Sequence, residues 1–465
     1  MRRLQVAELR DSWTAWLGVC LTFITVNFAL ALSALVEHVG VDAVLSGRMD
    51  YWSSASYTFA PALNLVLCLI VGAVVIGGST SLVVDSRRGS LARLSLVGAT
   101  PAQVVSTIMS QLVVVSLACA VVGDLVAYAM LQPTLQYLND DPTLQLVVPD
   151  AVYAVWPVLA ANLAAAGIAL IGGHRQARRA GAIPPVEALR IAAAAPDERM
   201  GAARWVRFGL CVAVLAAAFA LIPVLVSLEP KERFSNVVLA AVVVLIVAGA
   251  MLSVLAPAIV GPVTRAWTRL VPTRDPIWRL ARTIAAVKGA RFSKSVTPVM
   301  MTIGLLFGMV LLGGVMTGVV RSLGVELSAA GPTTMVSMLG LPLAVALSGG
   351  VGSLLMMAKQ REAELALVGV AGATPGQRFS LPVLEGVIVT VTGALLSLAM
   401  VGMTLGFLAV ALPAAGFPLI VVPQYETFAA SFGICLLVTI AATLGPSLGS
   451  LRKPEPAIIA RLVAE

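Results

Sequence analysis

Two carboxylates inside long apolar stretches are the first candidates for chemistry. Glu385 lies eleven residues after Thr374, in the inner part of its stretch, and Asp124 lies twenty-four residues after Thr100. A charge within a membrane is costly and usually faces protein or water, so such residues mark transport sites or polar contacts between helices. Both interpretations stay open for Glu385. Asp124 lies about 36 Å of helix beyond Thr100, near the outer interface, and we expect an ordinary solvated carboxylate there.

Motifs for nucleotide, hydrolytic or metal chemistry are missing from the sequence. A P-loop needs Gly-Lys-Ser/Thr to hold phosphates, and none of the five lysines follows a glycine. The five cysteines occur singly in apolar stretches, and His38 and His174 are far apart. We therefore expect no catalytic, cofactor or metal site in this chain.

A polar six-residue segment occurs twice, as GATPAQ at 98–103 and GATPGQ at 372–377. We call these segments the elbows. The glycine suits the left-handed conformation that ends a helix, the threonine is a good N-cap, and the proline fits the first helical position. The glutamine, three residues after the threonine, completes a capping box. In the two copies these residues are Gly98, Thr100, Pro101 and Gln103, and Gly372, Thr374, Pro375 and Gln377.

Each elbow follows a segment with an apolar residue at every third position. These residues are Leu91, Leu94 and Val97 in the first copy, and Leu365, Val368 and Ala371 in the second. The spacing predicts a short helix at the membrane surface with one apolar stripe. Such an element is either a rigid connection on which a partner protein docks or a well-capped turn at the lipid surface. Because the element occurs twice, we favour the docking role.

Each elbow must connect long apolar segments, and the composition of the chain indicates that it contains such segments. The chain is 59% hydrophobic and 12% charged, against roughly a quarter charged in soluble proteins. About twenty apolar residues suffice for a helix to cross a bilayer. We predict an all-α membrane protein with ten spans, near 13–36, 57–84, 104–131, 152–171, 208–228, 237–263, 296–320, 335–357, 380–411 and 428–448.

The basic residues predict the orientation of these spans. With both termini in the cytoplasm, 27 of the 31 lysines and arginines fall in cytoplasmic segments, which is a strong positive-inside bias. The net charge of +8 is then explained by contact with anionic membrane lipid. We expect no nucleic-acid partner.

The two elbows lie at matching places in two four-span blocks. PVEALR at 185–190 and PAIIAR at 456–461 follow the fourth span of each block. The sequence therefore predicts two parallel repeats around an inserted two-span hairpin. We place the first block with its linker at 1–205, the hairpin at 206–263 and the second block at 264–465.

A short helix that ends in Gly-Ala-Thr-Pro between the second and third spans of a four-span block resembles the FtsX-like permease domain. The segment 360–386 carries this resemblance well, with Glu362, Glu364 and Glu385 included. The first copy is weaker, because Arg88 and Ser90 replace the two glutamates that begin the second. The ten-span layout is similar to that of bacitracin-resistance permeases, but the outer segments are too short for the large extracellular domain usual in that class.

The resemblance implies a bacterial plasma-membrane permease of a MacB/FtsX-class ABC transporter. It implies two copies of a separate P-loop ATPase that bind ATP and Mg²⁺, and an amphipathic cargo such as an antimicrobial peptide, drug or lipid. An ion-driven secondary transporter and a non-transporting sensor of envelope stress are the alternatives. The residues expected to couple to the ATPase are Leu91, Leu94, Gly98, Thr100, Pro101, Glu362, Glu364, Leu365, Val368, Gly372, Thr374 and Pro375.

Without an outer domain, the cargo must meet the spans themselves. We expect a substrate seam between the repeats, flanked by the outer halves of the second and eighth spans. Its candidate residues combine apolar bulk with a few polar atoms, as ligand sites do, although helix packing alone explains them equally well. They are Tyr57, Phe59, Asn64, Met335, Ser337 and Met338.

Overall fold

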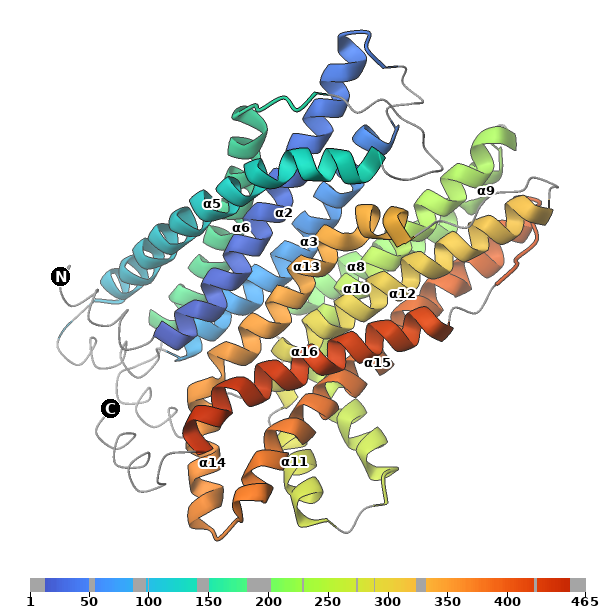
Figure 1. Cartoon of the computed structure of the whole chain (residues 1–465). Helices are drawn as coiled ribbons and strands as arrows, with labels where there is room; N and C mark the ends of the chain where they lie inside the picture. The colour runs from blue at the N-terminus through green and yellow to red at the C-terminus, as the bar shows by residue number, and fades with distance from the viewer. Residues whose placement is uncertain are drawn as a thin grey trace. The chain divides into compact units, whose positions relative to one another are not determined.

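The computed structural model is all-α throughout the residues that it describes (Figure 1). These residues are 13–49, 55–86, 98, 100–139, 150–181, 202–227, 230–272, 275–287, 289–322, 332–421 and 425–451. The helices are α2 (Trp13–Leu45), α3 (Ala55–Ser86), α5 (Pro101–Asn139), α6 (Trp156–Gly181), α8 (Ala202–Ala220), α9 (Ile222–Ser227), α10 (Pro230–Arg269), α11 (Pro276–Val287), α12 (Gly289–Ser322), α13 (Pro332–Met356), α14 (Ala358–Val370), α15 (Pro375–Ala414) and α16 (Tyr425–Leu451).

The helices confirm the predicted fold class. Among the described residues, nine helices are long and apolar enough to cross a membrane, and a tenth span results if the bent pair Gly340–Met356 and Arg361–Val370 is counted as one. Several helices exceed a simple crossing of about 20 residues, since α5 has 39 residues and α15 has 40. The first span was predicted to end near residue 36, whereas α2 continues to Leu45.

The helices form two compact units by their contacts. The first contains residues 1–197, 336–384 and 439–465, and the second contains 198–335 and 385–438. The first unit thus joins the first sequence block to α13 and α14 of the second. The repeat boundaries rest on sequence similarity alone and stay a prediction.

Helix α2 is the centre of the first unit and packs against α3, α5 and α6. Leu35, Tyr57 and Leu131, from three of these helices, are fully buried in one hydrophobic cluster. Burial of this kind holds the four helices together through close packing of their side chains.

Helix α13 joins α2 through small residues. A Cβ atom on Gly18 would lie 2.4 Å from the carbonyl oxygen of Gly352, and one on Gly352 would lie 2.5 Å from Oγ1 of Thr22. Only glycine permits this approach, which is the usual device of tightly crossing membrane helices. A helix of the second sequence block therefore packs directly on the first span.

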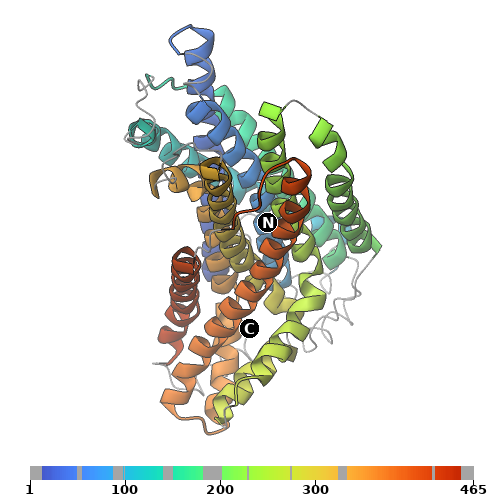
Figure 2. The ribbon, with the colours of Figure 1, turned by 90° about the vertical axis from the view of Figure 1, so that its right-hand side faces the viewer.

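Helix α10 organises the second unit by packing against α8, α11 and α12 (Figures 1 and 2). Its Thr264 hydroxyl lies 3.2 Å from that of Thr392 in α15, and the indole N–H of Trp267 donates to the same Thr392 oxygen at 3.0 Å. Interhelical hydrogen bonds between such side chains stabilise helix pairs in membranes. They fix α15 against α10 within this unit.

Candidate functional site

The second elbow ends α14 as its glycine predicts. Gly372 has a φ of +94°, in the left-handed region that favours glycine. Its N–H donates to the Gly369 carbonyl at 2.9 Å, and the Ala373 N–H donates to the Val368 carbonyl at 3.2 Å. These two bonds form a Schellman motif, which satisfies the last carbonyl groups of a helix.

The same elbow then starts α15 with the predicted capping box. The backbone N–H of Thr374 donates to Oε1 of Gln377 at 3.0 Å, and the N–H of Gln377 donates to Oγ1 of Thr374 at 3.3 Å. Helix α15 begins at Pro375. Four residues therefore separate two well-capped helices.

The first elbow shares the glycine conformation and the capping box in its described residues. Gly98 has a φ of +99°. Thr100 and Gln103 exchange hydrogen bonds of 2.9 and 3.3 Å, and α5 begins at Pro101. The structure thus confirms both predicted capping boxes. Leu91 and Leu94, which precede this elbow, lie outside the described residues.

Helix α14 presents a different apolar face from the predicted stripe. Leu365 is 1% exposed, and Val368 is half-buried. The large apolar side chains at its surface are Leu367 and Val370, which are 62% and 63% exposed. Leu365 is therefore part of the protein interior. The sequence interpretation missed Leu367 and Val370, although they are spaced three residues apart like the residues of the predicted stripe.

Two buried arginines flank the second elbow. Arg361 of α14 is 6% exposed and donates from Nη1 to the Thr443 carbonyl of α16 at 3.5 Å, and Arg378 of α15 is 4% exposed. Glu362 and Glu364 are half-buried on the same helix as Arg361. The first turns of α14 are thereby attached to α16. The sequence interpretation missed these arginines because it sought apolar and acidic residues.

A partly open cavity of about 520 Å³ lies in the first unit where the seam was expected. Asn64 of α3 and Leu341 of α13 line it, and α2 and α5 contribute the rest of its wall, which the sequence did not predict. Ser33 of α2 also lines it, and its buried hydroxyl has no hydrogen-bond partner among the described residues. The volume of this cavity and its mostly apolar lining are typical of a site that binds an apolar ligand.

The other predicted seam residues divide into two groups. Tyr57 is fully buried in the core cluster and does not line the cavity. The side chains of Phe59, Met335, Ser337 and Met338 lie outside the described part of the chain. Asn64 is therefore the one predicted seam residue that the described structure places in the cavity wall.

A comparison with protein families identifies the type of domain that contains the elbows. The model of the FtsX-like permease C-terminal family matches residues 62–185 and 336–454, which together exceed half of the chain. The chain belongs to the FtsX-like permease family. The permease is thus a non-catalytic, multi-pass membrane subunit of an ABC transporter in the bacterial cell membrane, and its partners are ABC ATPase subunits. A comparison with curated proteins returns no match.

The two family matches correspond in structure as well. The first runs from α3 into the segment after α6, and the second from α13 to the segment after α16, so each contains one elbow. The permease therefore places equivalent elbows within two copies of one family domain.

Two intramembrane carboxylates of the permease, Glu385 and Asp124, lie against neighbouring protein groups. Glu385 is 4% exposed on α15 and faces protein. Asp124 accepts a hydrogen bond from the Asn162 amide of α6 at 2.7 Å, and its other oxygen is buried with no partner among the described residues. The expectation of an ordinary solvated carboxylate at Asp124 is therefore wrong, because α6 packs over it.

The cysteines are closer together than their sequence spacing implies. The thiols of Cys20 in α2 and Cys119 in α5 lie close to one another, although 99 positions separate them. All five cysteines are free. In the described ranges, no group of three histidine, cysteine or acidic side chains could hold a metal ion.

Proposed function

We propose that the permease couples ATP hydrolysis by two copies of a separate ABC ATPase, with bound Mg²⁺, to export of an amphipathic substrate. The observation that carries this proposal is the pair of matching elbows. Two similar capped turns in one chain offer two similar docking sites, one for each ATPase subunit. One permease chain would then serve an ATPase pair.

The geometry of the second elbow suits the transmission of force. Gly340–Met356 and Arg361–Val370 meet at an angle of 45°, so α14 turns away from α13. The Schellman motif and the capping box leave residues 371–374 between α14 and α15, and Arg361 attaches α14 to α16. Displacement of α14 would therefore move both α15 and α16.

The exposed residues of α14 supply a contact surface. Leu367 and Val370 are exposed, and an apolar pair of this kind can anchor a protein interface. The positive-inside bias supports a cytoplasmic location for both elbows and both termini. On that orientation, Leu367 and Val370 face the compartment that contains ATP.

The cavity of the first unit supports an amphipathic cargo. Among the described residues, its wall carries no charged side chain and contains the polar groups of Ser33, Asn64, Thr134 and Tyr137. Such a site suits the apolar part of a peptide, drug or lipid, with a few hydrogen bonds to orient it.

The ATPase seat is tested by charge substitution at the exposed pair. L367D together with V370D should leave insertion intact, since both side chains are exposed, but should abolish co-purification of the ATPase and cargo-stimulated ATP hydrolysis. L270D is the matched control, because Leu270 is 81% exposed and lies outside both elbows. Unchanged ATPase binding by the double variant would contradict the proposal. L365D is not a suitable test, because a buried charge there would disturb folding.

A further inference from the structure

A carboxylate lies unpaired inside the first membrane-spanning helix. Glu37 is half-buried towards the C-terminal end of α2, in the 30-residue segment Trp16–Leu45 that is long and apolar enough to cross a membrane, and no residue of the described chain forms a hydrogen bond or ion pair with it. Ionisable groups within membrane spans are costly and normally have a partner. Glu37 therefore calls for a partner of positive charge from outside the chain.

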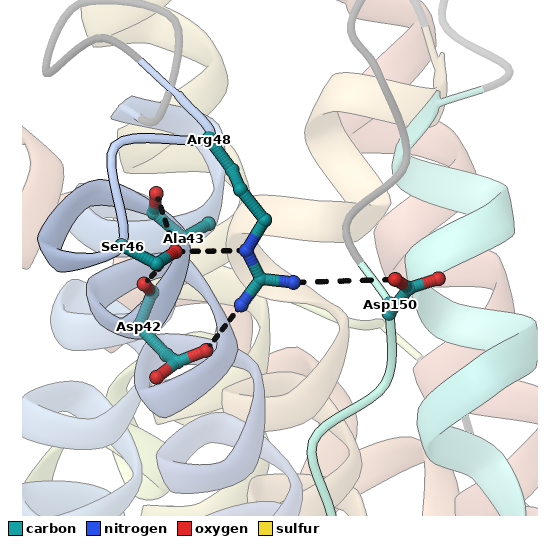
Figure 3. A network of polar contacts seen from close by, with 5 residues as sticks. All are labelled: Asp42, Ala43, Ser46, Arg48 and Asp150. Atoms are coloured by element: carbon teal, nitrogen blue, oxygen red, sulfur yellow. Dashed lines mark hydrogen bonds and ion pairs between the residues drawn. The ribbon is translucent and has the colours of Figure 1, made fainter.

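The arginine at the outer end of α2 does not fill this role. Arg48 binds Asp42 with one guanidinium nitrogen, donates from Nε to Ser46 at 2.8 Å and approaches Asp150 at 4.0 Å (Figure 3). Its charge is thus shared between two aspartates, so it does not supply a cation to Glu37 in the part of the chain that the structure describes.

Glu37 lines a second cavity, of about 280 Å³, between α2, α3 and α6. His38 and Trp156 lie beside it, with ring centroids 5.2 Å apart and ring planes at 83°. The rest of the wall is apolar and consists of Leu30, Ala34, Val41, Leu65, Leu69, Pro157, Ala160, Ala161 and Ala164. One end of the cavity therefore combines a carboxylate with an indole, and the remainder suits a hydrocarbon chain.

We propose that this cavity binds the ammonium group of a cationic amphiphile and part of its apolar chain. A carboxylate forms strong, charge-assisted hydrogen bonds with an ammonium, and the face of a tryptophan ring attracts cations. Trp156 is 63% exposed at the first residue of α6, so its ring is accessible at the mouth of the cavity. The aliphatic wall would bury the first methylene groups of the ligand.

This site is distinct from the larger cavity. Leu30, Ala34 and Glu37 line the smaller one, whereas Leu32 and Ser33 line the larger one. The two sets follow different faces of the same helix, since residues three and four apart share a face. Binding here is a property of the permease chain alone and does not depend on the ATPase.

The binding test uses native mass spectrometry of the full chain in a neutral maltoside detergent, with dodecylammonium as the probe, because its primary ammonium can donate hydrogen bonds to a carboxylate. The wild-type chain should retain one probe molecule. E37Q should weaken retention about tenfold or more through loss of the charged partner. W156L should weaken it severalfold, and this exposed position should tolerate the change. The control D150N removes a carboxylate at the same end of the molecule, outside the cavity, and should bind like wild type.

Equal binding by E37Q and wild type, or no saturable binding by wild type, would overturn the proposal. Two sources of the ammonium are then distinguished by competition. Displacement of the probe by phosphatidylethanolamine, but not by phosphatidylglycerol, identifies a membrane lipid as the occupant. Retention of the probe against both lipids excludes these lipids as the occupant and favours an amphiphile from outside the bilayer. Because no ATPase is present, these results are independent of the proposed export function.

Discussion

Thr374 and Gln377 cap one another: each accepts a hydrogen bond from the backbone N–H of the other, at 3.3 and 3.0 Å. Thr100 and Gln103 repeat this arrangement 274 residues earlier. Reciprocal capping satisfies two backbone donors at once. It therefore fixes the residue at which each long helix begins, and with it the direction in which the preceding segment meets that helix.

Removal of one cap should loosen the elbow. T374A should lower the free energy of unfolding by about 1 kcal/mol and reduce ATP hydrolysis by the assembled complex more than it reduces ATPase binding. T374S keeps the accepting oxygen and is the control. Thermal unfolding and ATPase assays on the two variants provide the measurements. Equal activity of T374A and T374S would show that the cap has no part in coupling.

The crossing of α2 and α13 should not tolerate a side chain at its glycines. In G352A the new methyl group would lie 2.5 Å from Thr22 Oγ1 and 2.6 Å from the Gly18 carbonyl oxygen, so the helices must separate. We expect a loss of about 1–3 kcal/mol, measured by thermal unfolding in detergent. The control is G402A, since a Cβ at Gly402 meets no atom within 4 Å. Alanine should be neutral or stabilising there.

Oxidation should cross-link the native pair Cys20 and Cys119. With copper phenanthroline and oxygen, the two thiols would lose two protons and two electrons to form a disulfide between α2 and α5. We expect both to resist alkylation afterwards, while Cys211 still reacts. C119S should restore alkylation of Cys20. Full alkylation of Cys20 in the oxidised wild-type chain would contradict the observed contact between these helices.

Substitutions at Glu385 separate ATP-driven export from ion-driven transport. If the buried carboxylate serves only as a polar contact, E385Q should keep most of the activity because glutamine retains size and hydrogen bonding, whereas E385L should lose it. Export in proteoliposomes should require ATP in each active variant. Equal inactivity of both variants, with flux that follows a proton gradient without ATP, would favour the secondary transporter.

The elbows could be predicted in detail because their determinants are local. Six consecutive residues set the helix stop, the cap and the helix start, and every hydrogen bond involved joins groups at most five residues apart. The all-α membrane fold was also predictable, since the length and apolarity of each span are properties of a single segment.

The helix faces could not be predicted in this way. Leu365 and Leu367 lie two positions apart in α14, and only packing within the first unit decides that the former is buried and the latter exposed. Periodicity defines a stripe, but it does not specify which stripe meets the protein when both are apolar.

The sequence alone determined the approximate places of the spans, the two elbows and the family resemblance. Only the tertiary structure placed Asn162 against Asp124, brought Gly352 to Gly18, and gathered Glu37 and Trp156 around one cavity. The physical reason is the distance along the chain over which the interactions act. Capping and hydrophobicity act within one segment, whereas cavities and polar partners depend on contacts between helices far apart in the chain, whose pairing is set by the fit of whole surfaces.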